Sequence, residues 1–365
     1  MGDLAELRKV LVLYTGGTIG MKKNHQGVLV PVPDVFTNKL KSCQELNDPD
    51  LARIYSVRNH ELITKVSSCS KVIAYQVREY HPLLDSCNMT PKEWVIIAKN
   101  IEENYNEFDG FVVLNGTDTL AFTSSALSFM FKNLHKPIVV TGSMIPIFEN
   151  PSDAKNNILS SLVFASISDI PEVCVFFANK LMRGNRVRKL ATSSIDCFDS
   201  PNYPILAETG FHCRIHRHYI LPKNDRSALL VHTCLSESVG ILYMFPTLSR
   251  TQLLSFLEPT LDGVVLMTFG AGNIPSHRQD LLDVLRNAVG RGVTVVSVTQ
   301  CIKGSVSFSY ETGKCMEEIG IIPCYDMTVE AAYAKLVVVC GMTRHSEERA
   351  ELMRQVFRGE MTIQH

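Results

Sequence analysis

The sequence predicts an α/β protein in two parts: a larger amino-terminal domain with a mainly parallel sheet and flanking helices, and a smaller α/β carboxyl-terminal domain. Three observations support this prediction. Short apolar runs alternate with helix-forming segments, two of those runs end in turns rich in glycine and hydroxyl residues, and the alternation breaks once, between about 199 and 225. A chain of 365 residues is also long enough to form two hydrophobic cores.

In the first part, apolar runs predict strands and periodic segments predict helices. The expected strands are 10–14, 72–77, 111–114, 137–140 and 172–177. The first of these, V-L-V-L-Y, is apolar throughout, which is typical of a strand buried on both faces. T-P-K-E at 90–93 reads as a capping box with proline at the first helical position, so a helix begins there. Two more helices are expected, one at about 120–131 and one after a cap at 152 or 153.

The second part begins after a segment in which prolines and polar residues interrupt the alternation. We place the connection at 201–225, which puts the two domains at 1–200 and 226–365. In the second domain the same reasoning predicts strands at 228–232, 263–268 and 293–298, and a helix over about 281–289.

The composition excludes several classes of protein. A net charge of -1 and 20% charged residues argue against a surface for nucleic acid. No apolar run approaches the ~20 residues that span a bilayer, and the amino terminus lacks a signal-peptide pattern. The 11 cysteines are scattered without a C-x-x-C pair, which suits a reducing, cytoplasmic compartment.

Two patterns in the sequence suggest a dinucleotide site and a metal site, but each pattern is incomplete. G-G-T-I-G at 16–20 follows a strand but lacks the G-x-G-x-x-G order of a dinucleotide loop. His212, Arg214, His216 and His218 share one face of an extended segment, which raises the alternative of a metal site. The arginine and the absence of a carboxylate favour a solvated edge strand instead, so no metal is expected.

The turn at 15–18, T-G-G-T, offers two hydroxyl groups at the carboxyl end of the first strand, where open α/β sheets bind ligands. A threonine hydroxyl becomes a nucleophile when a neighbouring base takes its proton. Thr18 is the better candidate because glycines precede it and a polar segment at 21–26, without apolar period, follows it as a loop that could close over a substrate. The structural alternative is that Thr15 and Thr18 only bond to turn backbone.

A second turn, N-G-T-D-T-L at 115–120, follows the strand at 111–114. Thr117 and Asp118 lie where a helix begins, so backbone amides there can receive an anion. Asp118 can accept from an ammonium group or hold a lysine, although an N-cap is its structural alternative. Lys189, in the basic run at 182–190, can pair with Asp118 and act as a base if burial lowers its pKa. The structural alternative is that the basic side chains of this run only face solvent.

The two turns together resemble the two signature motifs of the L-asparaginase family. Supporting stretches are L-L-D-S at 83–86, K-P-I-V-V-T-G-S at 136–143, R-G-N-R-V-R-K at 183–189 and F-G-A-G-N-I-P at 269–275. The similarity is greatest to the cytosolic type I branch, including its animal members. It implies a larger and a smaller α/β domain, and hydrolysis of L-asparagine to L-aspartate and ammonia without a cofactor.

By motif, the resemblance also implies roles for single residues. Thr18 would attack the side-chain amide, and Thr117, Lys189 and Asp118 would relay protons. The substrate would be held by the second turn and by two residues that precede the capped helix, Asp85 and Ser86. The α-carboxylate would lie near the serine and the α-ammonium near the aspartate of the second turn.

One position departs from the family pattern. Many members have a tyrosine in the loop after the first motif, where this chain has Val28. Some animal members use a tyrosine from the carboxyl-terminal domain, for which Tyr310 is the candidate here. Animal relatives also often continue into ankyrin repeats, whereas no such repeat is found up to His365.

Several alternatives stay open at this stage. The chain could be a silent amino-acid sensor, or an amidase that prefers glutamine or a larger amide, since one methylene changes affinity by only about 1–3 kcal/mol. The family also suggests a homodimer or homotetramer, and in some type I members a second asparagine site, which no residue here marks independently.

Overall fold

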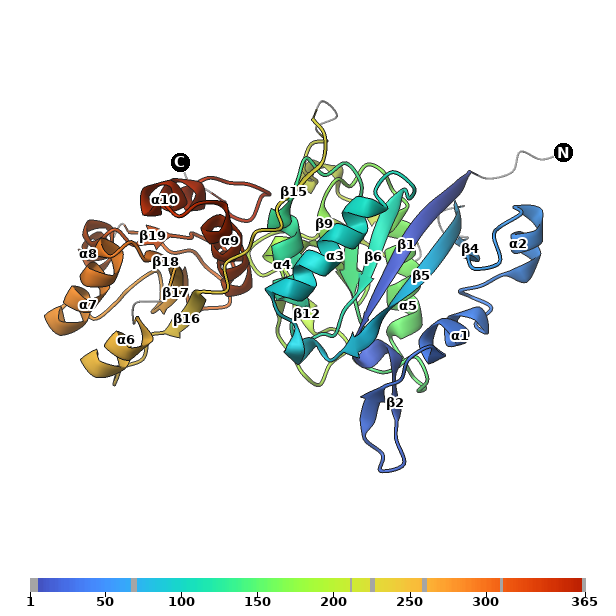
Figure 1. Ribbon diagram of the computed structural model, residues 1–365, viewed down its shortest axis with the longest axis horizontal. Coiled ribbons are helices and arrows are strands. Elements are labelled where there is room, and N and C mark those ends of the chain that lie inside the picture. The colour runs from blue at the N-terminus through green and yellow to red at the C-terminus, as the bar shows by residue number, and fades with distance from the viewer. Residues whose placement is uncertain are drawn as a thin grey trace. The chain divides into compact units, whose positions relative to one another are not determined.

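The computed structural model describes residues 6–66, 71–210, 212–223, 227–257, 261–308 and 311–362 (Figure 1). It divides the chain into two compact units. Unit 1 comprises Met1–Ser200 and Pro204–Val231, and unit 2 comprises Pro201–Tyr203 and His232–His365. Most of the segment 201–225, which the sequence suggested as a connection, therefore packs with unit 1. The predicted fold class is confirmed, because each unit is built on a sheet with parallel strands.

Unit 1 contains a nine-stranded sheet in the order β14-β13-β10-β9-β8-β6-β1-β5-β4. Its parallel block is formed by β5 (Lys71–Leu84), β1 (Leu7–Gly16), β6 (Gly110–Leu114), β8 (Ile138–Thr141) and β9 (Val173–Phe177). Antiparallel strands complete both edges: β4 (Leu62–Val66) on one side, and β10 (Lys180–Arg183), β13 (Ala207–Glu208) and β14 (Arg214–Ile215) on the other. All five strands that the sequence predicted for this part are present.

The helices of unit 1 are α1 (Val35–Lys41), α2 (Pro49–Ile54), α3 (Pro91–Glu103), α4 (Leu120–Met130) and α5 (Ala154–Ala165). The predicted capping box is confirmed, since Thr90 and Glu93 each bond to the other's backbone at the start of α3. Trp94 and Ile97 are buried on the inner side of α3. In Figure 1, α3 crosses the near face of the sheet whereas α5 lies behind β1 and β5. The helices thus cover the sheet and leave its strand ends free to carry function.

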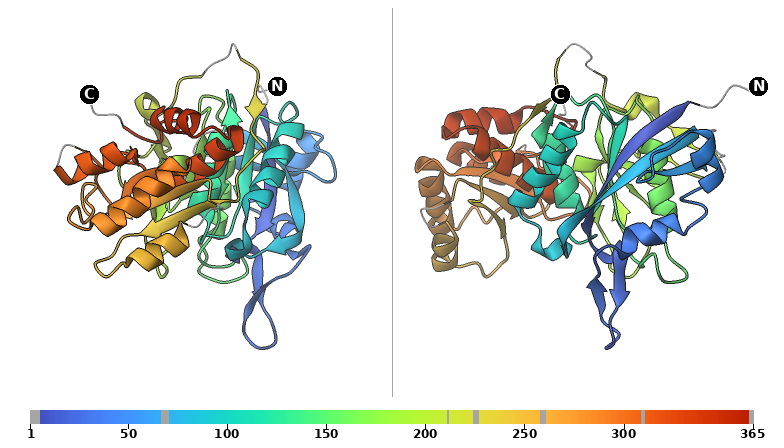
Figure 2. Two further views of the ribbon diagram at one scale, coloured as in Figure 1. Left: turned by 60° about the vertical axis from the view of Figure 1, so that its left-hand side comes forward. Right: turned by 45° about the vertical axis from the view of Figure 1, so that its right-hand side comes forward.

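Two predictions need correction, one for the first domain and one for a strand that was expected in the second. The polar segment at 21–26 is part of a hairpin of β2 (Met21–Lys23) and β3 (Leu29–Pro31), and not an open loop. The Asn24 side chain accepts from two backbone amides inside the turn, so a hairpin forms without an apolar period. Figure 2 shows this hairpin projecting from the sheet. The strand expected at 228–232 is only β15 (Leu230–Val231), which pairs with β7 (Phe131–Lys132) in unit 1.

An edge strand was predicted for the His-rich stretch. Only Arg214–Ile215 form one, β14, and the three histidines lie outside it. Arg214 is exposed on this strand. The rings of His216 and His218 lie at tilted angles to the Tyr219 ring, with centroids 6.3 and 3.9 Å from it. Among the described residues, no helix combines the length and apolarity that a membrane crossing would need.

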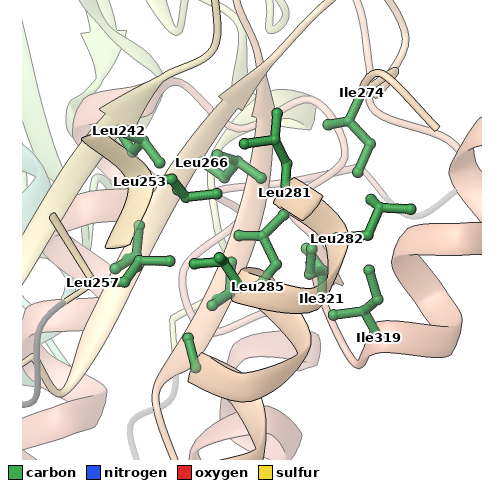
Figure 3. Close-up of a cluster of buried hydrophobic side chains, with 14 of the residues drawn as sticks. Leu242, Leu253, Leu257, Leu266, Ile274, Leu281, Leu282, Leu285, Ile319 and Ile321 are labelled. Atoms are coloured by element: carbon green, nitrogen blue, oxygen red, sulfur yellow. The ribbon is translucent and has the colours of Figure 1, made fainter. Parts of the chain in front are cut away.

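Unit 2 has a parallel sheet in the order β16-β17-β18-β19. The strands are β16 (Val239–Tyr243), β17 (Gly263–Thr268), β18 (Thr294–Thr299) and β19 (Ile322–Pro323). The helices are α6 (Arg250–Phe256), α7 (Gln279–Gly290), α8 (Glu311–Ile319), α9 (Val329–Met342) and α10 (Ser346–Arg354). Figure 3 shows the core on one side of this sheet, where Leu281, Leu282 and Leu285 of α7 pack against Leu242 and Leu266 of the strands.

A buried ion pair fastens the end of the described chain to α9. The Lys335 Nζ lies 2.7 Å from the Glu360 Oε1, and both side chains are fully buried. Lys335 also donates to the carbonyls of Met353 and Gln355, while the glutamate accepts from the Phe357 and Arg358 amides. Burial alone raises the pKa of the Glu360 carboxyl, but the lysine charge and these hydrogen bonds outweigh it, so the net pKa is lowered.

Glu360→Gln should therefore destabilise the protein by about 3–5 kcal/mol, because it leaves the Lys335 ammonium buried without a counter-charge. Equilibrium urea unfolding at pH 7 measures this loss, with Glu347→Gln on the exposed first turn of α10 as the control. Because the pKa is lowered, the ionised carboxylate contributes stability at pH values above 4.5, the ordinary pKa of a glutamate. The difference in unfolding free energy between wild type and variant should shrink as the pH falls and the Glu360 carboxylate becomes protonated. An equal difference at all pH values would contradict this account.

Candidate active site

The predicted site residues gather at the carboxyl ends of neighbouring parallel strands. After β1 the chain adds β5 on one side, and then returns to add β6 on the other side of β1. This reversal is the topological switch point at which open α/β sheets bind ligands. The turns after β1, β5 and β6 carry Thr18, Ser86 and Thr117, respectively.

Glycines allow these turns to touch. A Cβ on Gly17 would lie 2.4 Å from the Gly116 Cα, and one on Gly16 would lie 2.1 Å from the Leu84 carbonyl oxygen. The Gly17 amide also donates to that carbonyl at 3.0 Å. Gly17 has a φ of 83°, a conformation that side-chain-bearing residues rarely adopt. The first turn is therefore pressed against both of its neighbours.

The two threonines of the first turn have different environments. Thr15 is buried, and its hydroxyl donates to the Leu114 carbonyl at 3.0 Å, which ties β1 to β6. Thr18 is half-buried and begins a short 3-10 turn at the rim of the site. Among the described residues, the Thr18 hydroxyl makes no hydrogen bond. Thr15 thus has the structural role considered above, and Thr18 has a hydroxyl available to a ligand.

Lys189 joins the second turn from a distant part of the chain. Its Nζ lies 2.9 Å from the Thr117 Oγ1 and 2.7 Å from the Asp118 Oδ1. The lysine lies in β11 (Arg188–Lys189), which pairs with β12 (Phe198–Asp199). Its side chain is 17% exposed while that of Asp118 is 65% exposed, so the pair lies at the boundary of the interior. A hydroxyl, an amine and a carboxylate are thereby brought together.

The turn after β5 completes the cluster. Ser86 is buried, and its Oγ would lie 2.6 Å from a Cβ placed on Gly116. Its carbonyl accepts from the Thr119 hydroxyl at 2.9 Å, which links this turn to the start of α4. Asp85 precedes it and is exposed. The remaining predicted residue, Tyr310, lies outside the described residues, and Val28 is exposed on the β2–β3 hairpin.

Sequence reasoning assigned no role to the turn after β8, which packs against the second turn. A Cβ on Gly142 would lie 2.4 Å from the Asn115 carbonyl oxygen and 3.6 Å from the Thr117 Cγ2. The carboxylate of Asp153 fastens this turn by accepting from the Met144 and Ile145 amides, both at 3.0 Å. The signal was present, because T-G-S follows a predicted strand that neighbours the strand of the second turn.

A cysteine next to the site does not compete as a nucleophile. Cys197 is fully buried, and its carbonyl accepts from the Leu190 amide beside Lys189. Burial raises the pKa of its thiol to about 11, although the Lys189 charge lowers it. The thiolate needed for attack is therefore scarce at neutral pH.

This fold and this cluster define a class of protein, namely an α/β enzyme in two units whose threonine-bearing turns meet at the switch point of a parallel sheet. The chain belongs to the asparaginase family. The amino-terminal asparaginase domain matches residues 9–221, and the glutaminase/asparaginase carboxyl-terminal domain matches residues 238–353.

Relatives of known name support this assignment. The chain is 42% identical to an L-asparaginase of Dirofilaria immitis, over 97% of this chain and 60% of the relative. It is 42% identical to the 60 kDa lysophospholipase of Mus musculus, over 98% and 63%. It thus spans about three-fifths of these longer proteins. L-asparaginase 1 of Escherichia coli is 37% identical, over 97% of this chain and 98% of the relative. The crystal structure of L-asparaginase I from Vibrio cholerae matches with a TM-score of 0.84 and 38% identity, covering 98% of this chain and all of that one.

Proposed function

We propose that the protein hydrolyses L-asparagine to L-aspartate and ammonia, with Thr18 as the nucleophile. The observation that supports this proposal most directly is the Lys189 amine, which lies within hydrogen-bond distance of both Thr117 and Asp118. Such a group can take a proton through the Thr117 hydroxyl and return it later, because proton transfer needs donor and acceptor in contact.

The proposed reaction has two halves. The Thr18 Oγ attacks the side-chain amide carbon and passes its proton to the relay of Thr117 and Lys189. The oxyanion of the tetrahedral intermediate is stabilised by amides at the start of α4. The C–N bond then breaks, and the nitrogen takes a proton from the relay to leave as ammonia. Water, activated by the same Thr117–Lys189 pair, attacks the resulting ester and releases aspartate and the Thr18 hydroxyl. No cofactor takes part in this scheme.

The same turns would hold the substrate. Asp118 presents an exposed carboxylate that can accept from the α-ammonium group while it holds Lys189. Ser86, buried against Gly116, would bind the α-carboxylate, and Asp85 adds a second exposed carboxylate. A cytoplasmic location, a homodimer or homotetramer, membership of the animal-type branch and a role for Tyr310 also form part of the proposal.

Ammonia release by the purified chain tests this function. We expect turnover of L-asparagine, with L-glutamine as the comparison substrate for chain length. Because two relatives are named 60 kDa lysophospholipase, fatty-acid release from a lysophospholipid belongs in the same experiment. Binding of asparagine without ammonia release would instead support the silent sensor.

Gly17→Ala should lower asparagine turnover by about 100-fold or more, because displacing a turn by about 1 Å can cost that much in rate. The added Cβ would meet the Gly116 backbone and push Thr18 away from the second turn. Gly27→Ala is a matched control: it has a similar positive φ of 78° but open space around its Cβ. Equal losses for the two variants would show that backbone strain, and not the contact between the turns, is responsible.

A further inference from the structure

Unit 2 contains a cavity of about 1070 Å³, and no residue of the candidate active site is among its lining residues. It is found where β17 and β18 begin. Its walls are formed by 234–236, 261–262, 291–293, Arg349 and the turn from α9 to α10 at 340–346. Pockets for small ligands commonly have volumes of about 300–1,000 Å³, so this one has room for a ligand of metabolite size.

Among the described residues, Asp262 is the carboxylate in this lining, and Arg349 forms an ion pair with it. Its two oxygens accept from the Ser236 hydroxyl at 2.7 Å and from the Arg349 guanidinium at 3.2 Å. Arg349 is only 4% exposed and also donates to the carbonyls of Thr343 and Asp262. This pair therefore belongs to the wall of the cavity, and it leaves no net charge there.

Two other guanidinium groups line the cavity, and the described residues supply no counter-charge to either of them. Arg291 is exposed and donates to the Leu257 carbonyl at 2.7 Å, which leaves most of its donors available. Arg344 is exposed, and no acceptor for its side chain is found in the described part of the chain. His345 lies next to it on the same lining. The described lining thus carries an excess of positive charge, on groups whose planar donors suit carboxylate and phosphate.

The start of α10 adds backbone donors to the same wall. Ser346, the first residue of this nine-residue helix, lines the cavity, and the side chain of the N-cap residue His345 makes no capping hydrogen bond. Neither Glu347 nor Glu348 lines the cavity, and Glu348 accepts from the Thr343 hydroxyl at 2.6 Å. Helix starts of this kind favour negative ligands.

We infer that this cavity binds a small polyanion, a molecule with at least two phosphate or carboxylate groups, held by Arg291 and Arg344. Leu235, Leu261 and Met342 on the lining would contact the less polar part of the ligand. The inference does not depend on the proposed hydrolysis, because the two sites share no residue.

Calorimetric titration of the full chain tests this site, with inorganic tripolyphosphate and citrate as separate probes for phosphate and carboxylate. We expect saturable binding of one probe per chain at low salt. Arg291→Gln combined with Arg344→Gln should weaken it at least tenfold. Arg286→Gln is the matched control, because this exposed arginine lies on α7 outside the cavity and pairs with Asp283. Arg349 is left intact, since its loss would expose the Asp262 charge.

Cysteine alkylation supplies a second measurement that reports position. Cys234 is exposed and lines the cavity, whereas Cys87 and Cys301 are exposed elsewhere. The bound probe should slow modification of Cys234 several-fold, as read by peptide mass spectrometry, and leave the other two unchanged. Absence of saturable binding with both probes would overturn the inference. So would binding that the double variant leaves intact, or equal slowing at all three cysteines.

Discussion

Thr18→Ala should reduce ammonia release from L-asparagine by on the order of 10⁴-fold or more, because it removes the oxygen that forms the proposed ester. The methyl group that remains fits the same half-buried position, so circular dichroism and unfolding by urea should match the wild type. Asparagine should still bind, because its α-groups are held by the turns after β5 and β6. Rates under saturating substrate, beside calorimetric binding, separate these effects.

Thr18→Ser provides the conservative control, since it keeps a hydroxyl group at the same place and removes only the methyl group. We expect the serine variant to retain measurable turnover and the alanine variant to retain none above background. Turnover in the alanine variant within tenfold of the wild type would remove Thr18 from the mechanism while leaving the family assignment intact.

Lys189→Met should lower kcat by roughly 10²–10⁴-fold, the usual contribution of a positioned acid or base. Methionine preserves much of the side-chain length but removes the amine that contacts Thr117 and Asp118. Because the ester oxygen of Thr18 is retained, the loss should fall on kcat more than on KM. Release of Asp118 from its ion pair should change substrate binding only modestly.

Lys180→Met is a matched control for this variant. Lys180 forms a comparable pair with Asp196 at 2.8 Å, with exposed fractions of 27% and 55%, but lies on β10 away from the second turn. It should leave the rate unchanged. If both lysine variants lose activity equally, the effect comes from general charge or stability, and the relay proposed for Lys189 is wrong.

Local patterns predicted the elements on which unit 1 depends. The apolar runs that became β1, β6 and β8 are buried on both faces, so each needed only its own residues to be identified. The helix α3 was equally clear, because its capping box and apolar period lie within a few residues of one another. The prediction for unit 2 was less complete. The helix α9 was missed because its Ala, Val and Leu residues are buried on all sides, so no apolar period distinguishes one face.

The hairpin of β2 and β3 shows why other segments were misjudged. Its residues are largely exposed, so they carry no apolar alternation, and the Asn24 side chain, rather than packing, closes the turn. The strand expected at 228–232 was misplaced for a different reason. Two of its apolar residues do form a strand, but that strand pairs with β7, which lies about a hundred residues earlier in the chain. The local sequence gives no indication of such a distant partner.

The amino-acid sequence alone determined the alternating α/β elements, the two motif-bearing turns and the family to which the chain belongs, because each of these is written in residues adjacent along the chain. Only the tertiary structure decided which groups meet. Lys189 comes from a strand of two residues, too short to be predicted, and contacts Asp118 across 71 positions. The cavity of unit 2 likewise joins five separate stretches of the chain. Such contacts depend on how strands are ordered in a sheet, and short-range patterns do not encode that order.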